Sequence, residues 1–317
     1  MKLIAKLFLS ISAAALLAVN ARPQDQRTET PECLASQSAK MNAPCSTRQQ
    51  DSAAQNQDSA QEKQKRLPSL LRRWLEMAAN TQASQPDWLS PLATTSGRLK
   101  QEFRYDVWDQ PAAPGSTFQL GGNKGLEFIT SPRTQLLLGV PNYTFRSEKG
   151  PPGGFGDLPL MLKVRIASAE NAEGNYLLTF ILAATVPTGA HHYGAGAAVL
   201  TPTLALGKGW GRFDTQSTIG ITLPTGNTTK LGRQLQWNTA FQYRAAWKLW
   251  PELEVNSTFF QTGKAGEKQV FLTPGLGFGR VRIGRGFRFS TAVGMQIAVT
   301  RFHTYNHRWM FSERLSF

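Results

Sequence analysis

Four histidines are the residues of this sequence best suited to chemistry, and they occur as two pairs. His191 and His192 are adjacent, whereas three residues separate His303 from His307. A metal centre would require both pairs to converge with a carboxylate, and a lipase-like site would require a histidine close to a nucleophilic serine on a strand end. The sequence contains neither a G-x-S-x-G elbow nor an H-E-x-x-H motif. We therefore expect loop histidines and predict no catalytic residue, metal or cofactor.

Cys33 and Cys45 are the only cysteines, and they lie close together in a polar segment. In an oxidising compartment they could close a small disulfide loop. Two unpaired thiols are the alternative. A metal site would need more ligands than this pair supplies.

The amino-terminal residues have the pattern of an export signal followed by a polar tail. Residues 1–21 combine Lys2 and Lys6 with a short apolar run and a small-residue cleavage site, which is typical of a secretory signal peptide. Residues 22–96 form a predicted periplasmic tail, disordered where glutamine, serine and asparagine dominate. Within the tail, residues 66–80 carry leucines at helical spacing and predict a short amphipathic helix. This helix could lie on the inner leaflet, plug a lumen, meet a partner or pack under the main domain.

The remaining sequence, residues 97–317, consists of segments in which apolar and polar residues alternate. This period of two predicts strands with one apolar and one polar face. In the last segment Trp309, Phe311 and Leu315 share the apolar parity, although Glu313 shares it too and would be penalised by lipid away from an interface or seam. We count about twelve segments: 99–107, 123–130, 134–145, 155–168, 175–186, 197–206, 212–223, 233–247, 252–261, 268–281, 285–300 and 306–317.

An even number of strands, joined by alternating short and long connections, is typical of a bacterial outer-membrane barrel. The predicted fold class is all-β: a transmembrane, antiparallel, up-and-down β-barrel of about twelve strands behind a disordered or short-helical amino-terminal segment. Both termini would face the periplasm. Phe317 resembles the terminal residue that the barrel assembly machinery reads. For the last segment alone, an edge strand of a soluble sandwich is the alternative.

Charged and amide side chains on the polar parity are predicted to face the lumen, because Arg or Lys facing lipid at mid-strand would cost about 2–4 kcal/mol. They form either a selectivity lining or ion pairs across a narrow lumen, such as Arg244 with Glu254. Both interpretations stay open, since about twelve strands leave little internal space. The predicted pore-lining residues are Asp157, Lys163, Arg165, Asp214, Gln216, Gln236, Asn238, Gln242, Arg244, Glu252, Glu254, Arg288 and Gln296.

The formal net charge of +14 could indicate a nucleic-acid partner. The basic residues are scattered through the tail, loops and strands without a clustered motif, so we expect no nucleic acid. Basic loops would instead face anionic lipopolysaccharide, and basic lumen residues would favour anions. General surface charge is the simpler account of most of the excess.

Several strand ends carry short motifs with a family resemblance. Val186-Pro187-Thr188-Gly189 and Leu223-Pro224-Thr225-Gly226, together with Gly154-Phe155-Gly156-Asp157 and Trp237-Asn238-Thr239-Ala240, resemble a family of proteobacterial and acidobacterial outer-membrane barrels. That family is named for a role in the meta-pathway of phenol degradation. The resemblance covers roughly residues 97–317 and implies a channel for aromatic or other small hydrophobic compounds. Its motifs describe strand ends and turns, so no catalytic residue is carried over.

The predicted function is therefore that of a porin-like channel in the outer membrane, in contact with outer-membrane lipid, for passive uptake of small hydrophobic or aromatic solutes. Two alternatives from other classes stay open. One is an outer-membrane enzyme that acts on lipid, and the other is a structural barrel with a filled lumen.

Overall fold

The computed structural model describes residues 68–317 except 113–114, 123, 148–151, 191, 246–247 and 285. The predicted signal peptide, Cys33, Cys45 and His191 lie outside the described residues. The chain divides into two compact units, and the first ends at Glu76. Of that first unit the structure describes the start of helix α3 (Ser69–Ala83), where Arg72 and Glu76 form an ion pair of 3.9 Å one helical turn apart.

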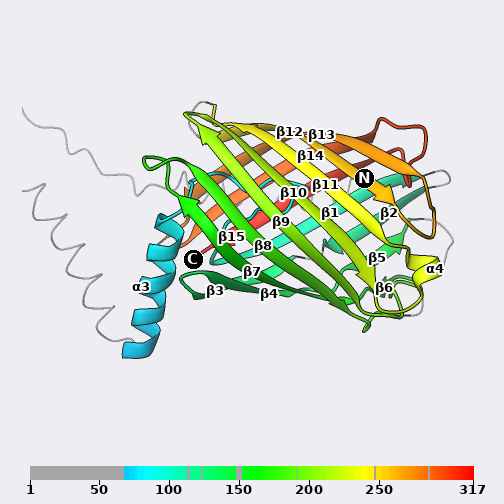
Figure 1. Cartoon of the computed structure of the whole chain (residues 1–317), viewed down its shortest axis with the longest axis horizontal. Helices are drawn as coiled ribbons and strands as arrows, with labels where there is room; N and C mark the ends of the chain where they lie inside the picture. Colours follow the sequence, from blue (N-terminus) through cyan, green and yellow to red (C-terminus); the bar gives the residue numbers. More distant parts are fainter. Residues whose placement is uncertain are drawn as a thin grey trace, which may run out of the picture. The chain divides into compact units, whose positions relative to one another are not determined.

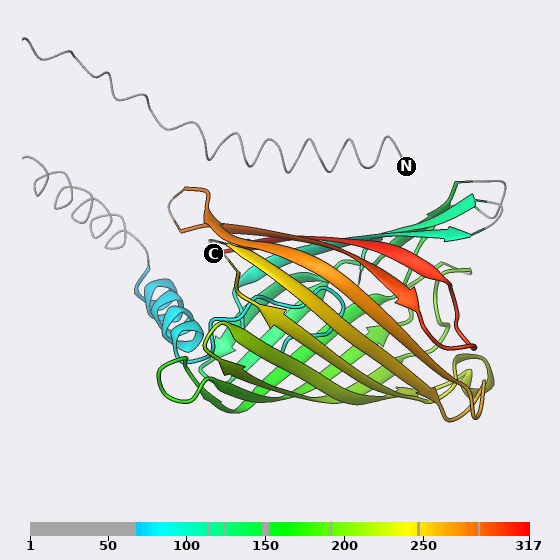
Figure 2. The same cartoon turned by 90° about the horizontal axis from the view of Figure 1, so that it is seen from above.

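The second unit contains a closed, antiparallel β-barrel of twelve strands, which confirms the predicted fold class. The strands run at a slant to the long axis of the barrel (Figures 1 and 2). Strand β1 closes the ring against β15, in a register that runs from Glu102 opposite Ser316 to Asp109 opposite Trp309. The segments are β1 (Glu102–Ala112), β2 (Gly115–Gly121), β3 (Gly125–Ser131), β4 (Thr134–Gly139), β5 (Tyr143–Arg146), β6 (Gly154–Phe155), β7 (Leu158–Ala169), β8 (Tyr176–Val186), β9 (Val199–Trp210), β10 (Phe213–Pro224), β11 (Gln234–Tyr243), β12 (Leu249–Phe260), β13 (Lys268–Arg282), β14 (Arg288–Ala298) and β15 (His307–Ser316).

Three neighbouring strands of the barrel are each interrupted once, so that each consists of two segments. The fifteen segments therefore make twelve strands. The second strand breaks between β2 and β3, where Gly122 has a φ of +58°. The third breaks between β4 and β5 at Pro141, which has no N–H to donate to a ladder. The fourth breaks between β6 and β7 at Gly156. Beyond these breaks, β5 pairs with both β2 and β6, at the same end of the barrel as helix α4 (Thr228–Leu231) (Figure 1).

The outward face of the barrel is apolar and exposed, as the period of two predicts. Side chains such as Leu204, Ile219 and Leu253 lie on this surface, while polar residues beside them in the sequence are buried inside. Trp210, Phe213 and Phe241 stack on the outer face near one end, with ring centroids 6.2 and 6.4 Å apart. Among the described residues, no helix is long and apolar enough to cross a membrane.

The two ends of the barrel differ. We call the end with the connections 132–133, 211–212 and 283–287 the turn end, and the end with α4 the loop end. Ser316 pairs with Arg288, the first residue after the connection 283–287, and therefore lies at the turn end. Glu102 lies at the same end because it pairs with Ser316 across the closing seam. The loop expected over 109–122, between the predicted strands 99–107 and 123–130, is wrong: these residues continue β1 to Ala112 and form β2, because the two segments pair with each other as a hairpin.

Candidate functional site

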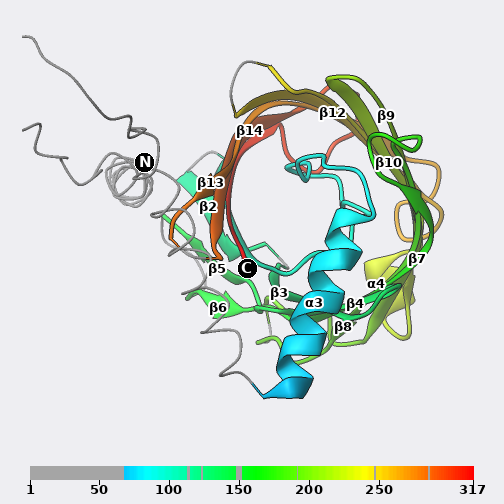
Figure 3. The same ribbon diagram turned by 90° about the vertical axis from the view of Figure 1, so that its left-hand side faces the viewer.

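Residues 84–101, here called the luminal segment, lie inside the ring of strands (Figure 3). The segment enters the barrel after α3 and returns to the start of β1, and its two legs are tied together. The side chain of Gln85 donates to the carbonyl of Leu99 at 2.6 Å and accepts from the Leu99 amide at 3.0 Å. Arg98 also donates to the carbonyl of Trp88. Trp88 is 3% exposed and Leu92 is 1% exposed, so this polar-looking stretch buries apolar side chains in the lumen.

Glycines on the inner face of the wall receive the apolar side chains of the luminal segment. A Cβ at Gly207 would lie 2.5 Å from the Trp88 ring, and one at Gly279 would lie 2.8 Å from Leu89. A Cβ at Gly294 would lie 2.6 Å from Leu92. Such distances are shorter than van der Waals contact, so each glycine provides space that any other residue would fill. These strand glycines are therefore part of the seat of the luminal segment.

Residues 90–94 form the tip of the luminal segment. Two arginines from the closing seam bind the tip on one side. Arg104 on β1 donates to the carbonyls of Pro91 and Leu92 at 3.2 and 2.7 Å. Arg314 on β15 donates to the carbonyls of Ser90 and Pro91 at 2.5 and 3.1 Å. Both guanidinium groups are buried. Because these are charge-assisted bonds to backbone groups, they fix the position of the tip whatever its side chains are.

A carboxylate on the other side of the lumen holds the next two residues. Glu254 on β12 accepts hydrogen bonds from the amides of Ala93 and Thr94 at 2.7 and 2.6 Å. The ion pair expected between Arg244 and Glu254 is wrong, since Glu254 is engaged by the luminal segment and Arg244 lies over the ring of Trp250 at 5.9 Å. The arginines bind the carbonyls and the glutamate binds the amides, so the tip is held from both sides.

The returning leg ends in a buried polar network at the turn end. Lys163 Nζ lies 3.1 Å from Glu127 Oε2, and Lys100 Nζ lies 2.9 Å from Glu102 Oε1. Gln135 joins these pairs, donating to Glu127 at 2.5 Å and accepting from the Lys100 amide at 2.5 Å. Burial lowers the pKa of Lys100, which precedes the first strand, to about 8, and Glu102 opposes that shift. Burial thus disfavours the charged form of Lys100, and its carboxylate partner offsets part of that cost.

A chain of amides and carboxylates follows the opposite wall. Gln216 donates to the carbonyl of Leu89 at 2.9 Å and to Asp214 at 3.1 Å. It also donates to Gln242 at 3.1 Å, and Gln242 donates to Glu252 at 2.6 Å. The chain of contacts links strands β10, β11 and β12 to the luminal segment.

Two cavities lie against the luminal segment. The first, here called the inner cavity, has a volume of about 420 Å³ and opens beyond the tip toward the loop end. Leu92, Trp108, Ile181 and Met310 supply apolar lining, and the guanidinium of Arg308 lies 3.9 Å from the centre of the Trp108 ring. Polar lining comes from Asp106, Lys124, Gln236, Asn238 and several threonines.

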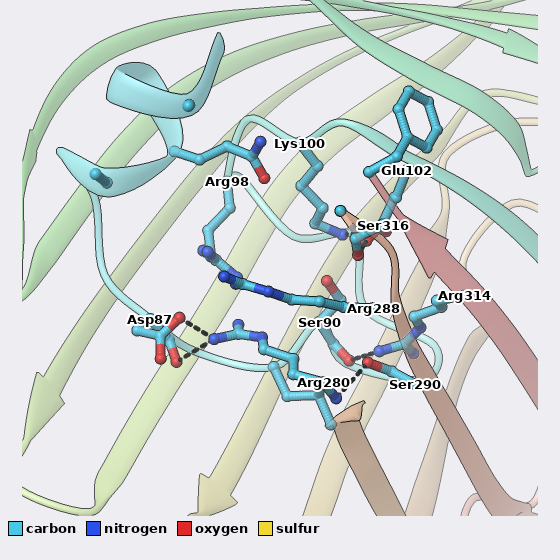
Figure 4. A pocket seen from close by; sticks show the side chains of 16 residues that line it. Asp87, Ser90, Arg98, Lys100, Glu102, Arg280, Arg288, Ser290, Arg314 and Ser316 are labelled. Atoms are coloured by element: carbon cyan, nitrogen blue, oxygen red, sulfur yellow. Dashed lines mark hydrogen bonds and ion pairs between the residues drawn. The ribbon is translucent and has the colours of Figure 1, made fainter. Parts of the chain in front are cut away.

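The second cavity, here called the basic pocket, has a volume of about 370 Å³ and lies at the turn end (Figure 4). Leu89 and Ser90 line it, whereas Leu92 and Ala93 line the inner cavity. The tip of the luminal segment therefore separates the two cavities. A solute crossing the barrel would have to pass it.

The structure places the predicted pore-lining residues in several environments. Gln236 and Asn238 line the inner cavity and Arg288 lines the basic pocket. Six residues are buried inside the wall and bonded to each other or to the luminal segment: Lys163, Asp214, Gln216, Gln242, Glu252 and Glu254. Gln296 is also buried, but it donates to Asn256 and accepts from Tyr305. Asp157 accepts from the loop amides of Gly189 and Ala195, and Arg165 donates to the carbonyl of Thr81. That these residues line a conducting pore stays a prediction.

Several residues of the site were not singled out from the sequence. Arg104, Asp106 and Arg314 stand on the polar parity of predicted strands, so the period of two contained the signal for them. Trp108 and Arg308 also face the lumen, but an inward tryptophan has no distinct sequence pattern. Within the described residues, no group of three or more His, Cys, Asp and Glu is arranged to hold a metal, and His303 bonds Thr300 and Asn306 in a loop.

The seat of Leu89 gives a first prediction. Gly279→Val should loosen the luminal segment, because overpacking of this kind typically costs about 1–3 kcal/mol. The neighbours that a Cβ at Gly279 would meet are Leu89 and the hydroxyl of Ser290, so the strand itself is not strained. Trypsin should cleave after Arg98 or Lys100 several-fold faster in the folded variant. The double variant Gly279→Val, Leu89→Ala should restore protection, and equal cleavage rates in all three proteins would contradict this seating.

Comparisons with known proteins add little beyond the fold. No family model matches the sequence, so the family resemblance stays a prediction. A search of curated proteins finds no match. Among solved structures, the chain is similar to an outer membrane channel from Pseudomonas putida F1, at 14% identity over 69% of this chain and 96% of that chain, with a TM-score of 0.46.

Two further solved structures are similar at lower values. One comes from a study of the in-meso crystallisation of membrane proteins, at 9% identity over 68% of this chain and 83% of that chain, with a TM-score of 0.38. The other is in-vitro folded OmpT, an outer membrane protein of Vibrio cholerae in its trimer form, at 8% identity over 68% and 97%, with a TM-score of 0.30. None of these likenesses carries an argument beyond the barrel that the strand pairing already shows.

Proposed function

We propose that this protein is an outer-membrane channel for passive uptake of small hydrophobic or aromatic solutes, gated by the luminal segment. The observation that carries the proposal is a closed barrel with an apolar outer face and an inner cavity of about 420 Å³. An apolar belt around a polar lumen is the arrangement that a lipid bilayer requires of a barrel.

The lining of the inner cavity supports the choice of solute. Trp108, Met310 and Leu92 provide apolar and aromatic surface, while Gln236 and Asn238 provide hydrogen-bonding groups. Small-molecule sites of about 300–1,000 Å³ commonly combine apolar walls with a few polar groups, and this cavity lies within that range. A single aromatic ring with one polar substituent fits such a lining better than a sugar, whose hydroxyls would face apolar walls without partners.

The luminal segment supports gating rather than a permanently open pore. Its tip lies between the two cavities, held by Arg104, Arg314 and Glu254. These contacts are hydrogen bonds at the tip with small apolar seats around them, so water can replace many of them when the segment moves. We expect passage to require displacement of the tip.

A structural barrel with a filled lumen is the second candidate. The extensive bonding between the luminal segment and the wall favours it, as do the buried ion pairs of Glu102 and Glu127. A permanently seated segment would leave no continuous path. The two candidates therefore differ in whether any solute crosses.

The proposal predicts solute entry into liposomes that contain the refolded full chain. Small aromatic acids should enter faster than sugars of similar size, because the inner cavity offers aromatic and apolar contacts. Empty liposomes and liposomes with heat-unfolded protein are the controls. Equal entry of both solutes would leave a channel but contradict the aromatic preference. No entry of either, from protein shown to be folded, would favour the structural barrel.

A further inference from the structure

The basic pocket contains more positive than negative charge. Five cationic side chains line it, from Arg98, Lys100, Arg280, Arg288 and Arg314, against the carboxylates of Asp87 and Glu102. Figure 4 shows Arg98, Arg280 and Arg288 reaching into the pocket from different parts of the chain.

Two of these cations form ion pairs and three do not. Lys100 pairs with Glu102, and Arg280 pairs with Asp87. Arg98, Arg288 and Arg314 form no ion pair with any residue that the structure describes. Arg314 donates only to the hydroxyl of Ser312 and to backbone carbonyls.

Arg98 carries a second sign of an incomplete site. Its side chain is buried, and within the described part of the chain its Nε has no hydrogen-bond partner. A buried donor on a charged group that is left unbonded costs more than an ordinary missing hydrogen bond. An anion in the basic pocket would supply the missing acceptor.

The rest of the lining indicates what kind of anion fits. Leu89, Ala79, Ala83 and Phe317 provide apolar surface beside the arginines, while Ser90 and Ser290 provide hydroxyl groups. The volume of about 370 Å³ suits a small organic molecule and exceeds what a bare inorganic ion needs. Guanidinium groups match carboxylate oxygens in a two-point geometry.

We propose that the basic pocket binds a small organic carboxylate with an apolar body, such as an aromatic acid, through Arg98 and Arg288. This site is separate from the inner cavity, because the tip of the luminal segment lies between them. Binding does not depend on whether the barrel conducts, so the inference goes beyond the proposed channel function. It assigns a ligand class to the turn end of the lumen.

The test is calorimetric titration of the full chain in detergent with benzoate, with neutral benzyl alcohol and with inorganic phosphate. Benzoate should bind, and Arg288→Gln should weaken its binding roughly tenfold, because a charge-assisted contact is lost. Arg288 is exposed at the rim of the pocket, so this variant should fold. Arg98→Gln should weaken binding at least as much. Arg212→Gln is the matched control, since it removes the same charge from a turn at the same end, outside the pocket.

Each other outcome overturns part of the proposal. Benzyl alcohol binding as tightly as benzoate would show that the carboxylate is not recognised. Phosphate binding as tightly as benzoate, with the same loss in Arg288→Gln, would overturn the organic class of the ligand. Unchanged benzoate binding in folded Arg288→Gln and Arg98→Gln, or an equal loss in Arg212→Gln, would overturn the site. Because titration reads binding and liposome entry reads passage, either proposal can fail without the other.

Discussion

Removing residues 85–96 should raise solute entry into liposomes on the order of tenfold or more, and should turn a small or intermittent conductance into a steady one. The deletion removes the tip that separates the inner cavity from the basic pocket. A twelve-stranded barrel is intermediate between the side-chain-filled eight-stranded barrels and the open sixteen-stranded ones, so its free lumen depends strongly on what fills it. Planar-bilayer conductance and liposome entry of an aromatic acid both measure the change.

The barrel should survive this deletion because its closure does not use the removed residues. The seam between β1 and β15 is a continuous ladder from Glu102 to Asp109 on one side. Heat-modifiable mobility on gels would confirm that the shortened chain folds. Entry at the wild-type rate from folded protein would show that the luminal segment does not control passage.

A reducible lock tests the same movement in the opposite direction. Leu89→Cys with Gly279→Cys should form a disulfide, because the two positions face each other at short range: a Cβ at Gly279 would lie 2.8 Å from one Leu89 methyl group. Cys33→Ser and Cys45→Ser in every protein of the series prevent other pairings. Oxidised protein should admit less solute than the reduced form of the same protein. Equal entry before and after reduction would contradict gating by displacement of the tip.

The strands of this barrel could be predicted because each carries its own pattern. Leu253 faces outward and Glu254 inward because alternate residues of a strand face opposite sides, and that rule needs no knowledge of the partner strand. The loop expected over 109–122 is wrong because here the structure depends on the partner strand, which a local pattern does not show. Its two prolines and its glycines are typical of a loop, yet cross-strand pairing between β1 and β2 overrides them.

The luminal segment could not be predicted in this way because its partners are distant in the sequence. Glu254 binds amides about 160 residues away, and Gln216 binds a carbonyl 127 residues away. A periodic pattern within one segment of the sequence cannot indicate such contacts. Gly277 and Gly279 stand in the alternating segment 268–281, and the structure shows that they make space for Leu89. Inward glycines on several strands were thus the available signal that something occupies the lumen.

Breaking the Lys163–Glu127 pair should have the largest effect on stability. Lys163→Met leaves the Glu127 carboxylate buried beside Gln135, without the cation that is hydrogen-bonded to it. The two side chains are 2% and 4% exposed, so water cannot replace the lost partner without opening the lumen. Breaking one side of a buried pair typically costs about 3–5 kcal/mol, which should appear as a lower midpoint of urea-induced unfolding in lipid vesicles.

Replacing both residues with neutral ones shows how much of the lost stability comes from burying the Glu127 carboxylate without its hydrogen-bonded lysine. Lys163→Met with Glu127→Gln removes both charges and keeps the approximate volume, so the double variant should be more stable than Lys163→Met alone. Arg72→Ala removes one partner of the exposed Arg72–Glu76 pair and should leave the midpoint nearly unchanged, because exposed pairs contribute little. If the double variant were as unstable as Lys163→Met, the loss would come from packing around the lysine stem. The buried carboxylate would then not be what destabilises the wall of the lumen.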